Sequence, residues 1–233
     1  MRYGAFFDMN GTLMRGEPGF EFIVVLHERG HCSDADFARM QEAIGRFRRR
    51  EISNEAVAEE MFGVLRAGVA GLAVDNVMEA YAVRYRERLR PSIFPYARAL
   101  VARLRDLGCV TYAVTNVARP LLDPLMEDIG LEQAIAPELE QVAGRFTSRL
   151  LHWEGAQQVK GHGVRLVAEQ DGIDLAASFA FGDGEGDASF LELVGHPVAV
   201  NPTPALLAIA TARGWPVVRE TGVVDEVVRV LDL

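Results

Sequence analysis

Short apolar runs alternate with longer stretches of helical spacing along the chain. The apolar runs predict strands at 2–7, 109–114, 177–181 and 197–200, with a further candidate at 215–218. Apolar positions recur with helical spacing at 96–107, 120–129, 164–171, 189–194 and 204–213, and 135–150 predicts two short extended pieces around a turn. Strands that alternate with helices are typical of a parallel sheet covered on both faces. We therefore predict an α/β fold with a Rossmann-like, three-layer core.

A long helical stretch interrupts this alternation after the first strand. From 16 to 90 the apolar positions follow helical spacing, and no convincing strand is present. Ser33 is a candidate N-cap, with an acid at the capping-box spacing. Phe47 and Phe62 are expected to pack inside this region. The sequence thus predicts an α/β core of residues 1–15 and 91–233 and an all-helical insert of residues 16–90.

Three of the expected strands end in polar residues. Asp8 follows the first strand, Thr115 and Asn116 follow the second, and the acid-rich segment 182–187 follows the third. In open α/β sheets, ligands bind at the carboxyl ends of the strands. Each segment alone fits a turn or a helix cap equally well. Their shared edge, with Lys160 nearby in the sequence, favours a binding site.

Composition and charge limit the class of protein. The net charge of −9 argues against a nucleic-acid partner, because phosphate backbones bind basic surfaces. Cys32 and Cys109 have neither a disulfide framework nor metal-ligand spacing. No signal peptide is evident, and no apolar run approaches the roughly 20 residues of a membrane-spanning helix. We expect a soluble, cytoplasmic protein without a membrane partner, as a monomer or a homodimer.

Four segments resemble, in chain order, the motifs of the haloacid dehalogenase-like phosphohydrolase superfamily. Residues 8–12, Asp-Met-Asn-Gly-Thr, resemble the nucleophile motif. Thr115 at a strand end resembles the Ser/Thr motif, and Lys160 before a helix resembles the basic motif. The segment Gly182–Asp187 resembles the acidic motif. Taken together, the four segments imply a phosphoryl-transfer enzyme.

The resemblance extends to one branch of the superfamily. Residues 136–147 and 190–202 look like the phosphoserine-phosphatase-like branch, as does a helical insert between the first two motifs. In that branch the insert is a cap that closes over the site and selects the substrate. The basic run 46–50 reads as a solvated helix face, with the alternative that one arginine reaches a substrate anion. The implied substrate is a small phosphorylated metabolite, and phosphoserine itself is not assured.

The resemblance also assigns roles to individual residues. Asp8 would be the nucleophile that forms an aspartyl phosphate, and Thr115 and Lys160 would complete the catalytic group with residue 10. Magnesium would be the cofactor, because it takes hard oxygen ligands. Its ligands would be Asp8, the backbone carbonyl of Asn10, Asp183 and Asp187. The substrate-binding residues would be Gly11, Thr12, Glu17 and Asn116.

Asn10 departs from the motif at a catalytic position. Phosphatases of the superfamily carry a second Asp there, which protonates the leaving oxygen and then activates water. An amide does neither, since it has no titratable proton near neutral pH. Three explanations stay open: an engineered variant that holds substrate, a natural member with weak or lost phosphatase activity, or a member with different chemistry. Metal binding should persist in all three, because that contact is through the backbone.

Overall fold

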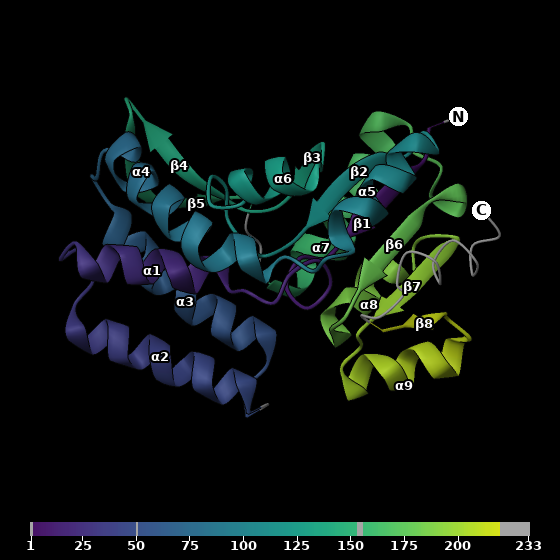
Figure 1. Cartoon of the computed structure of the whole chain (residues 1–233), viewed down its shortest axis with the longest axis horizontal. Coiled ribbons are helices and arrows are strands. Elements are labelled where there is room, and N and C mark those ends of the chain that lie inside the picture. The colour runs from purple at the N-terminus through teal and green to yellow at the C-terminus, as the bar shows by residue number, and fades with distance from the viewer. Residues whose placement is uncertain (1, 50, 153–155, 220–233) are drawn as a thin grey trace.

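The computed structural model describes residues 2–49, 51–152 and 156–219 and has two parts (Figure 1). One part is a six-stranded sheet in the order β3-β2-β1-β6-β7-β8, in which every neighbouring pair is parallel. Its strands are β1 (Gly4–Phe7), β2 (Val110–Val114), β3 (Gln133–Ile135), β6 (Phe179–Gly182), β7 (His196–Val200) and β8 (Val217–Val218). The predicted α/β class with a parallel sheet is confirmed.

The central strand separates two hydrophobic layers, because successive side chains in a strand point to opposite faces. In β1, Ala5 and Phe7 belong to one apolar cluster and Phe6 belongs to the other. Helices α5 (Ala97–Asp106) and α6 (Asp123–Ile129) contribute to the first cluster. Helices α7 (Ala156–Asp171), α8 (Ala188–Leu191) and α9 (Pro204–Arg213) contribute to the second. The sheet is therefore the middle of three layers.

The second part is helical and lies between β1 and β2 in the sequence. Its helices are α1 (Pro18–Glu28), α2 (Asp34–Arg48), α3 (Asn54–Val69) and α4 (Val74–Arg84), followed by a π-helical turn at Tyr85–Leu89 and a 3₁₀ turn at Arg90–Ser92. The Ser33 hydroxyl accepts a hydrogen bond from the Asp36 backbone N–H at 3.1 Å, as the sequence predicts. Arg50, in the basic run, lies outside the described residues. We call residues 18–92 the helical insert.

A two-stranded antiparallel hairpin joins the two parts. Strands β4 (Glu138–Val142) and β5 (Arg145–Leu151) flank the turn Ala143–Gly144, where both residues have positive φ. The Phe146 backbone carbonyl accepts from Gly71 at 2.8 Å, and its N–H donates to Leu72 at 3.0 Å. The hairpin follows β3 in the sequence, yet its backbone is bonded to the link between α3 and α4.

Side chains from α4 and from the π-helical turn after it connect the insert to the core. The Tyr81 hydroxyl donates to the Leu121 carbonyl oxygen at 3.1 Å, and the Tyr85 hydroxyl donates to the Asp128 carboxylate at 2.6 Å. The two connecting segments also pair, since the Phe94 N–H donates to the Leu13 carbonyl oxygen at 3.0 Å. No helix of the described residues is long and apolar enough to cross a bilayer.

Helix α7 begins earlier than the sequence predicts. It starts at Ala156, so Lys160 lies within the helix and not before it, which corrects the expected boundary. The glycines at 161 and 163 favour a later start on propensity alone. A Cβ at Gly161 would lie 2.7 Å from the Ser189 carbonyl oxygen, so glycine lets α7 pack closely on α8. Tertiary packing here outweighs local propensity.

Candidate active site

Asp8 and Asp183 follow β1 and β6, two neighbouring strands at the centre of the sheet. Strands β2 and β3 lie on one side of β1, and β6, β7 and β8 lie on the other, so the strand order reverses between β1 and β6. Such a switch point, at the carboxyl ends of the strands, is where open α/β sheets bind ligands. The Asp8 N–H donates to the Phe181 carbonyl oxygen at 2.9 Å and holds the two strand ends together.

The turn after β1 requires glycine at position 11. Gly11 has a φ of 89°, and a Cβ built there would overlap the carboxylate of Asp183. Two other segments fix the turn from outside. The Asn201 amide donates to the Gly11 carbonyl oxygen at 3.4 Å, and the Tyr96 hydroxyl donates to the Thr12 carbonyl oxygen at 2.5 Å.

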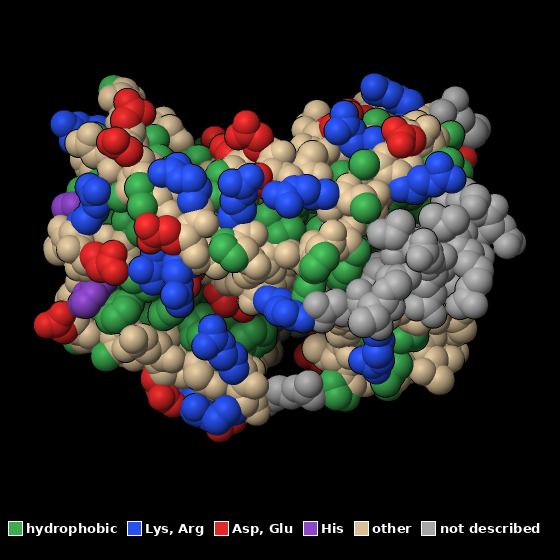
Figure 2. Space-filling view, in the orientation of Figure 1, with side chains coloured by type: hydrophobic (Ala, Val, Ile, Leu, Met, Phe, Trp, Pro, Cys, Tyr) green, Lys and Arg blue, Asp and Glu red, His purple; other side chains and the backbone are tan. Residues whose placement is uncertain are grey.

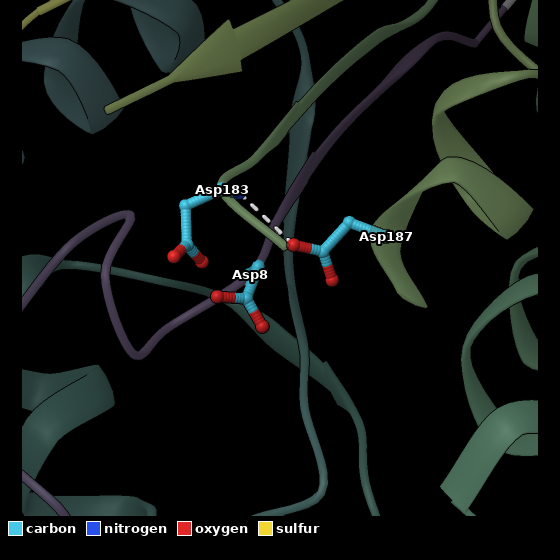
Figure 3. A group of neighbouring side chains, drawn as sticks. All are labelled: Asp8, Asp183 and Asp187. Atoms are coloured by element: carbon cyan, nitrogen blue, oxygen red, sulfur yellow. Dashed lines mark hydrogen bonds between the residues drawn. The ribbon is translucent and has the colours of Figure 1, made fainter. Parts of the chain in front are cut away.

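Three carboxylates converge at this edge of the sheet (Figure 3). Asp8, Asp183 and Asp187 each have an oxygen within 4.8 Å of the other two. Asp187 is oriented by backbone bonds, because its Oδ2 accepts from the Asp183 N–H at 3.0 Å and from the Gly184 N–H at 2.9 Å. Asp8 and Asp187 are buried, so this negative charge is largely removed from water.

Lys160 provides the cation that this group needs. Its Nζ lies 2.5 Å from Asp8 Oδ1 and 2.6 Å from Asp187 Oδ1, and the residue is only 5% exposed. Burial alone would lower the pKa of Lys160, but the two carboxylates raise it above its usual value. Lys160 therefore stays charged. It is also the only lysine in a chain with 23 arginines.

Two of the carboxylates, Asp8 and Asp183, have raised pKa values. Burial, with the charges of Asp8 and Asp187, raises the pKa of Asp183 to about 9. Burial and the charge of Asp187 also raise the pKa of Asp8 to about 6, against the opposing effect of Lys160. Both shifts favour the protonated acid, as expected where like charges crowd in a poorly solvated space. A bound cation would relieve them.

Thr115 and Asn116 bring uncharged polar groups to the same cavity as Asp8. The Thr115 Oγ1 accepts from the Val117 N–H at 3.1 Å, which fixes the turn after β2. The Asn116 Oδ1 is buried and has no hydrogen-bond partner among the described residues. Thr12 is buried and does not line the cavity, so the structure sets it apart from the other expected substrate-binding residues.

The side chains of Asn10 and Glu17 are joined by a hydrogen bond. The Asn10 Nδ2 donates to Glu17 Oε2 at 2.7 Å, whereas its Oδ1 is buried without a partner in the described part of the chain. Burial raises the pKa of Glu17 to about 7; Arg48 and the Asn10 bond oppose this rise, and Asp8 adds to it. Both side chains line the cavity with Asp8. The structure thus links the residue that departs from the motif to a predicted substrate-binding acid.

A cavity of about 800 Å³ extends from these residues to the helical insert. Figure 2 shows a hollow in the surface between the insert and the sheet-bearing part. Residues 184–186 of the predicted acidic motif line one side of the cavity, and the sequence prediction missed the neighbouring wall formed by 203–205. The polar segment Asn201–Thr203 directly follows the fourth predicted strand, so the strand-end rule could have included it. The Thr203 N–H donates to the Asp183 carbonyl oxygen at 2.8 Å.

A protein-family model for haloacid dehalogenase-like hydrolases matches residues 5–192. The chain belongs to this family. Among the relatives, the phosphoserine phosphatase SerB1 of Mycobacterium tuberculosis is 30% identical over 219 residues, which cover 91% of this chain and 69% of SerB1. These findings confirm the predicted family, its phosphoserine-phosphatase-like branch and the phosphatase class.

Solved structures agree on the fold. A Bordetella pertussis protein of unknown function is 28% identical with a TM-score of 0.78, and the match covers 94% of this chain and 99% of that one. A substrate-bound phosphoserine phosphatase has a TM-score of 0.65 at 18% identity, covering 95% of this chain and 94% of its own. At that identity, the second match shows the shared fold alone.

Proposed function

We propose that this haloacid dehalogenase-like hydrolase cleaves small phosphomonoesters through an aspartyl phosphate on Asp8, with Mg²⁺ as cofactor. The observation that carries this proposal is the contact of a buried carboxylate, at the carboxyl end of the central strand, with Lys160 on the wall of a large cavity. The substrates implied by relatives such as SerB1 are phosphorylated metabolites. The helical insert serves as the cap over this site.

The residues divide the chemistry between them. A carboxylate oxygen of Asp8 attacks phosphorus, the bond from phosphorus to the ester oxygen breaks, and the leaving alkoxide takes a proton from water, because Asn10 cannot supply one. Water then cleaves the aspartyl phosphate, which releases inorganic phosphate and restores Asp8. The Thr115 hydroxyl and the Asn116 backbone N–H hold a phosphoryl oxygen. Lys160 offsets the negative charge that the carboxylates and the phosphoryl group bring together.

The acidic residues fit a magnesium ion. Asp8, Asp183, Asp187 and the backbone carbonyl of Asn10 would hold it, since Mg²⁺ prefers hard oxygen ligands. The raised pKa values of Asp8 and Asp183 reflect burial first and the repulsion of neighbouring carboxylates second, and a divalent cation would oppose both effects. When bound, Mg²⁺ neutralises charge on the phosphoryl oxygens.

Asn10 favours a second candidate function, the binding of a phosphorylated ligand with little turnover. Its side chain has no proton to give, and its amide is already committed to Glu17. Loss of a general acid/base typically slows a reaction by about 10²–10⁴-fold. The remaining residues of the proposed site do not depend on that proton. A member with chemistry other than phosphate hydrolysis is the further alternative.

The substitution Asn10→Asp tests the proposal. A carboxyl at residue 10 would lie beside Glu17, and the two acids would share a proton that can pass to the leaving oxygen. We expect kcat for a generic phosphoester with Mg²⁺ to rise at least about tenfold. Asn10→Ala is the matched control, because it removes the amide without adding an acid and should give no gain.

Asp8→Asn completes this experiment. It should abolish Mg²⁺-dependent hydrolysis in both the native and the Asn10→Asp background. Retained turnover would mean that another group is the nucleophile. No gain from Asn10→Asp, with no turnover in any variant, would favour the ligand-binding alternative.

A further inference from the structure

The cavity changes character as it leaves the carboxylates. On α3, the side chains of Val57, Ala58, Met61, Phe62 and Leu65 line it. These positions are spaced so that they share one face of the helix. Phe47, in the last turn of α2, and Ile52, between α2 and α3, extend the wall, and Val117 and Ala118 face the cavity from the core. The end of the cavity away from Asp8 is therefore walled mainly by aliphatic and aromatic groups.

Beyond Asp8, Asp183, Asp187 and Lys160, the charged residues that line this cavity are either in contact with other side chains or, like Glu185 and Arg48, exposed to solvent. Glu17 accepts from Asn10, and the charge of Arg48 acts on Glu17. Glu51 is paired with Arg49 at 2.8 Å, and the Arg15 guanidinium lies over the Phe94 ring at 4.9 Å. A zwitterionic leaving group would have to displace these contacts, pair with exposed Glu185 or Arg48 where water weakens ion pairs, or lie against apolar side chains, where burying an unpaired charge is costly.

The volume of the cavity also favours a leaving group larger than an amino acid. At about 800 Å³, the cavity is in the upper part of the range of about 300–1,000 Å³ that encloses drug-sized ligands. A phosphorylated amino acid is much smaller and would leave most of the apolar wall uncovered. Met61 also lies close to α1, because a Cβ on Gly19 would overlap its sulfur.

We propose that the preferred substrate is the phosphomonoester of an alcohol with an extended apolar body, alkyl or aryl, which lies against α3. This inference rests on the proposed function, because it places the phosphate at Asp8. Each methylene buried on the α3 face should improve binding by about 0.8 kcal/mol, which is about fourfold. An amino-acid phosphate should gain little from the same surface.

Binding of alkylphosphonates tests this inference apart from turnover, since their carbon–phosphorus bond is not hydrolysed. Ethyl-, butyl- and hexylphosphonate are titrated calorimetrically into the full chain with Mg²⁺, and phosphoserine is titrated alongside. We expect Kd to fall severalfold per added methylene, and hexylphosphonate to bind at least tenfold more tightly than phosphoserine. A Kd independent of chain length, tighter phosphoserine binding, or no phosphonate binding would overturn the inference.

A pair of methionine variants locates the effect. Met61→Gln keeps the length of the side chain but places an amide in the wall, and it should reduce the gain from ethyl- to hexylphosphonate at least threefold. Met78→Gln is the matched control, because Met78 is on α4 and does not line the cavity. Equal loss in both variants would overturn the assignment to α3. Chain-length dependence without any hydrolysis, in the native chain or in Asn10→Asp, would contradict the proposed function and leave standing only the preference of the cavity for an apolar phosphorylated ligand.

Discussion

Gly11 and Gly30 both adopt a left-handed backbone, but only Gly11 has a functional side chain against it. Their φ values are 89° and 75°. A Cβ on Gly11 would overlap the Asp183 carboxylate, whereas no other part of the described chain lies within 4 Å of a Cβ on Gly30. The two glycines therefore separate the cost of a strained backbone from the cost of displacing a proposed metal ligand.

We predict that Gly11→Ala weakens Mg²⁺ binding at least tenfold, because the added methyl group must displace Asp183. Calorimetric titration of the metal measures this effect. Gly30→Ala is the control: it introduces comparable backbone strain, of order 1 kcal/mol, and should leave Mg²⁺ affinity unchanged. Equal metal affinity in the two variants would contradict the role assigned to Gly11.

The sequence predicted those residues of the proposed site that directly follow a strand. Asp8, Thr115 and Asp183 each end a predicted strand, and the structure brings all three to one cavity. The apolar face of α3 was not recognised, because helical spacing shows that a face is covered but not by what. Phe62 was expected to pack inside the insert, and it both packs there and lines the cavity.

The β4–β5 hairpin, which we call the strap, binds the helical insert through the backbone of Phe146. Phe146 is 1% exposed, and its backbone N–H and carbonyl both bond to the α3–α4 link. Val142, on the neighbouring strand, is 59% exposed. The two side chains therefore give a matched pair for measuring what the strap contributes.

We predict that Phe146→Ala destabilises the chain by about 3–5 kcal/mol, because it removes a fully buried aromatic ring. Val142→Ala should change the free energy of unfolding by less than about 0.5 kcal/mol. Urea denaturation followed by circular dichroism measures both. Similar values for the two variants would show that the hairpin does not stabilise the fold as its burial implies.

Local signals at both ends gave helix α9 its correct bounds, whereas elements decided by distant contacts were missed or misplaced. Helix α9 has Pro204 in its first turn and Gly214 just past its end, and it spans the predicted residues. Strand β3 is only three residues long and joins the sheet by pairing with β2, which the sequence did not indicate. The start of α7 was missed because Gly161 serves packing on α8 and not helix propensity.

At the scale of the molecule, repulsion among the carboxylates at the sheet edge lowers the stability of the folded chain. Asp8, Asp183 and Asp187 crowd within 4.8 Å, and the one ammonium at the group is Lys160, among the residues that the structure describes. Ion binding to the folded chain alone would shift the folding equilibrium by mass action. The free energy of unfolding should therefore depend on the concentration of the metal ion.

We predict that Mg²⁺ at a hundred times its Kd stabilises the fold by about 2.7 kcal/mol, seen as a rise in Tm. Asp183→Asn should raise Tm without metal, since it removes one crowded carboxylate, and should abolish the response to Mg²⁺. Glu79→Gln, on the exposed side of α4, removes the same charge and should do neither. An unchanged Mg²⁺ response in Asp183→Asn would remove that residue from the proposed metal site.

Because Lys160 is the only lysine in the sequence, its chemical modification can report on access of solvent to the buried site. Because every other basic side chain is arginine or histidine, an amine-directed acylating reagent can modify only Lys160 and the terminal amino group. The Lys160 ammonium is enclosed between two carboxylates beneath the insert, so its acylation requires the site to open. Mass spectrometry of the labelled chain over time would therefore report on opening of the site, without an engineered probe.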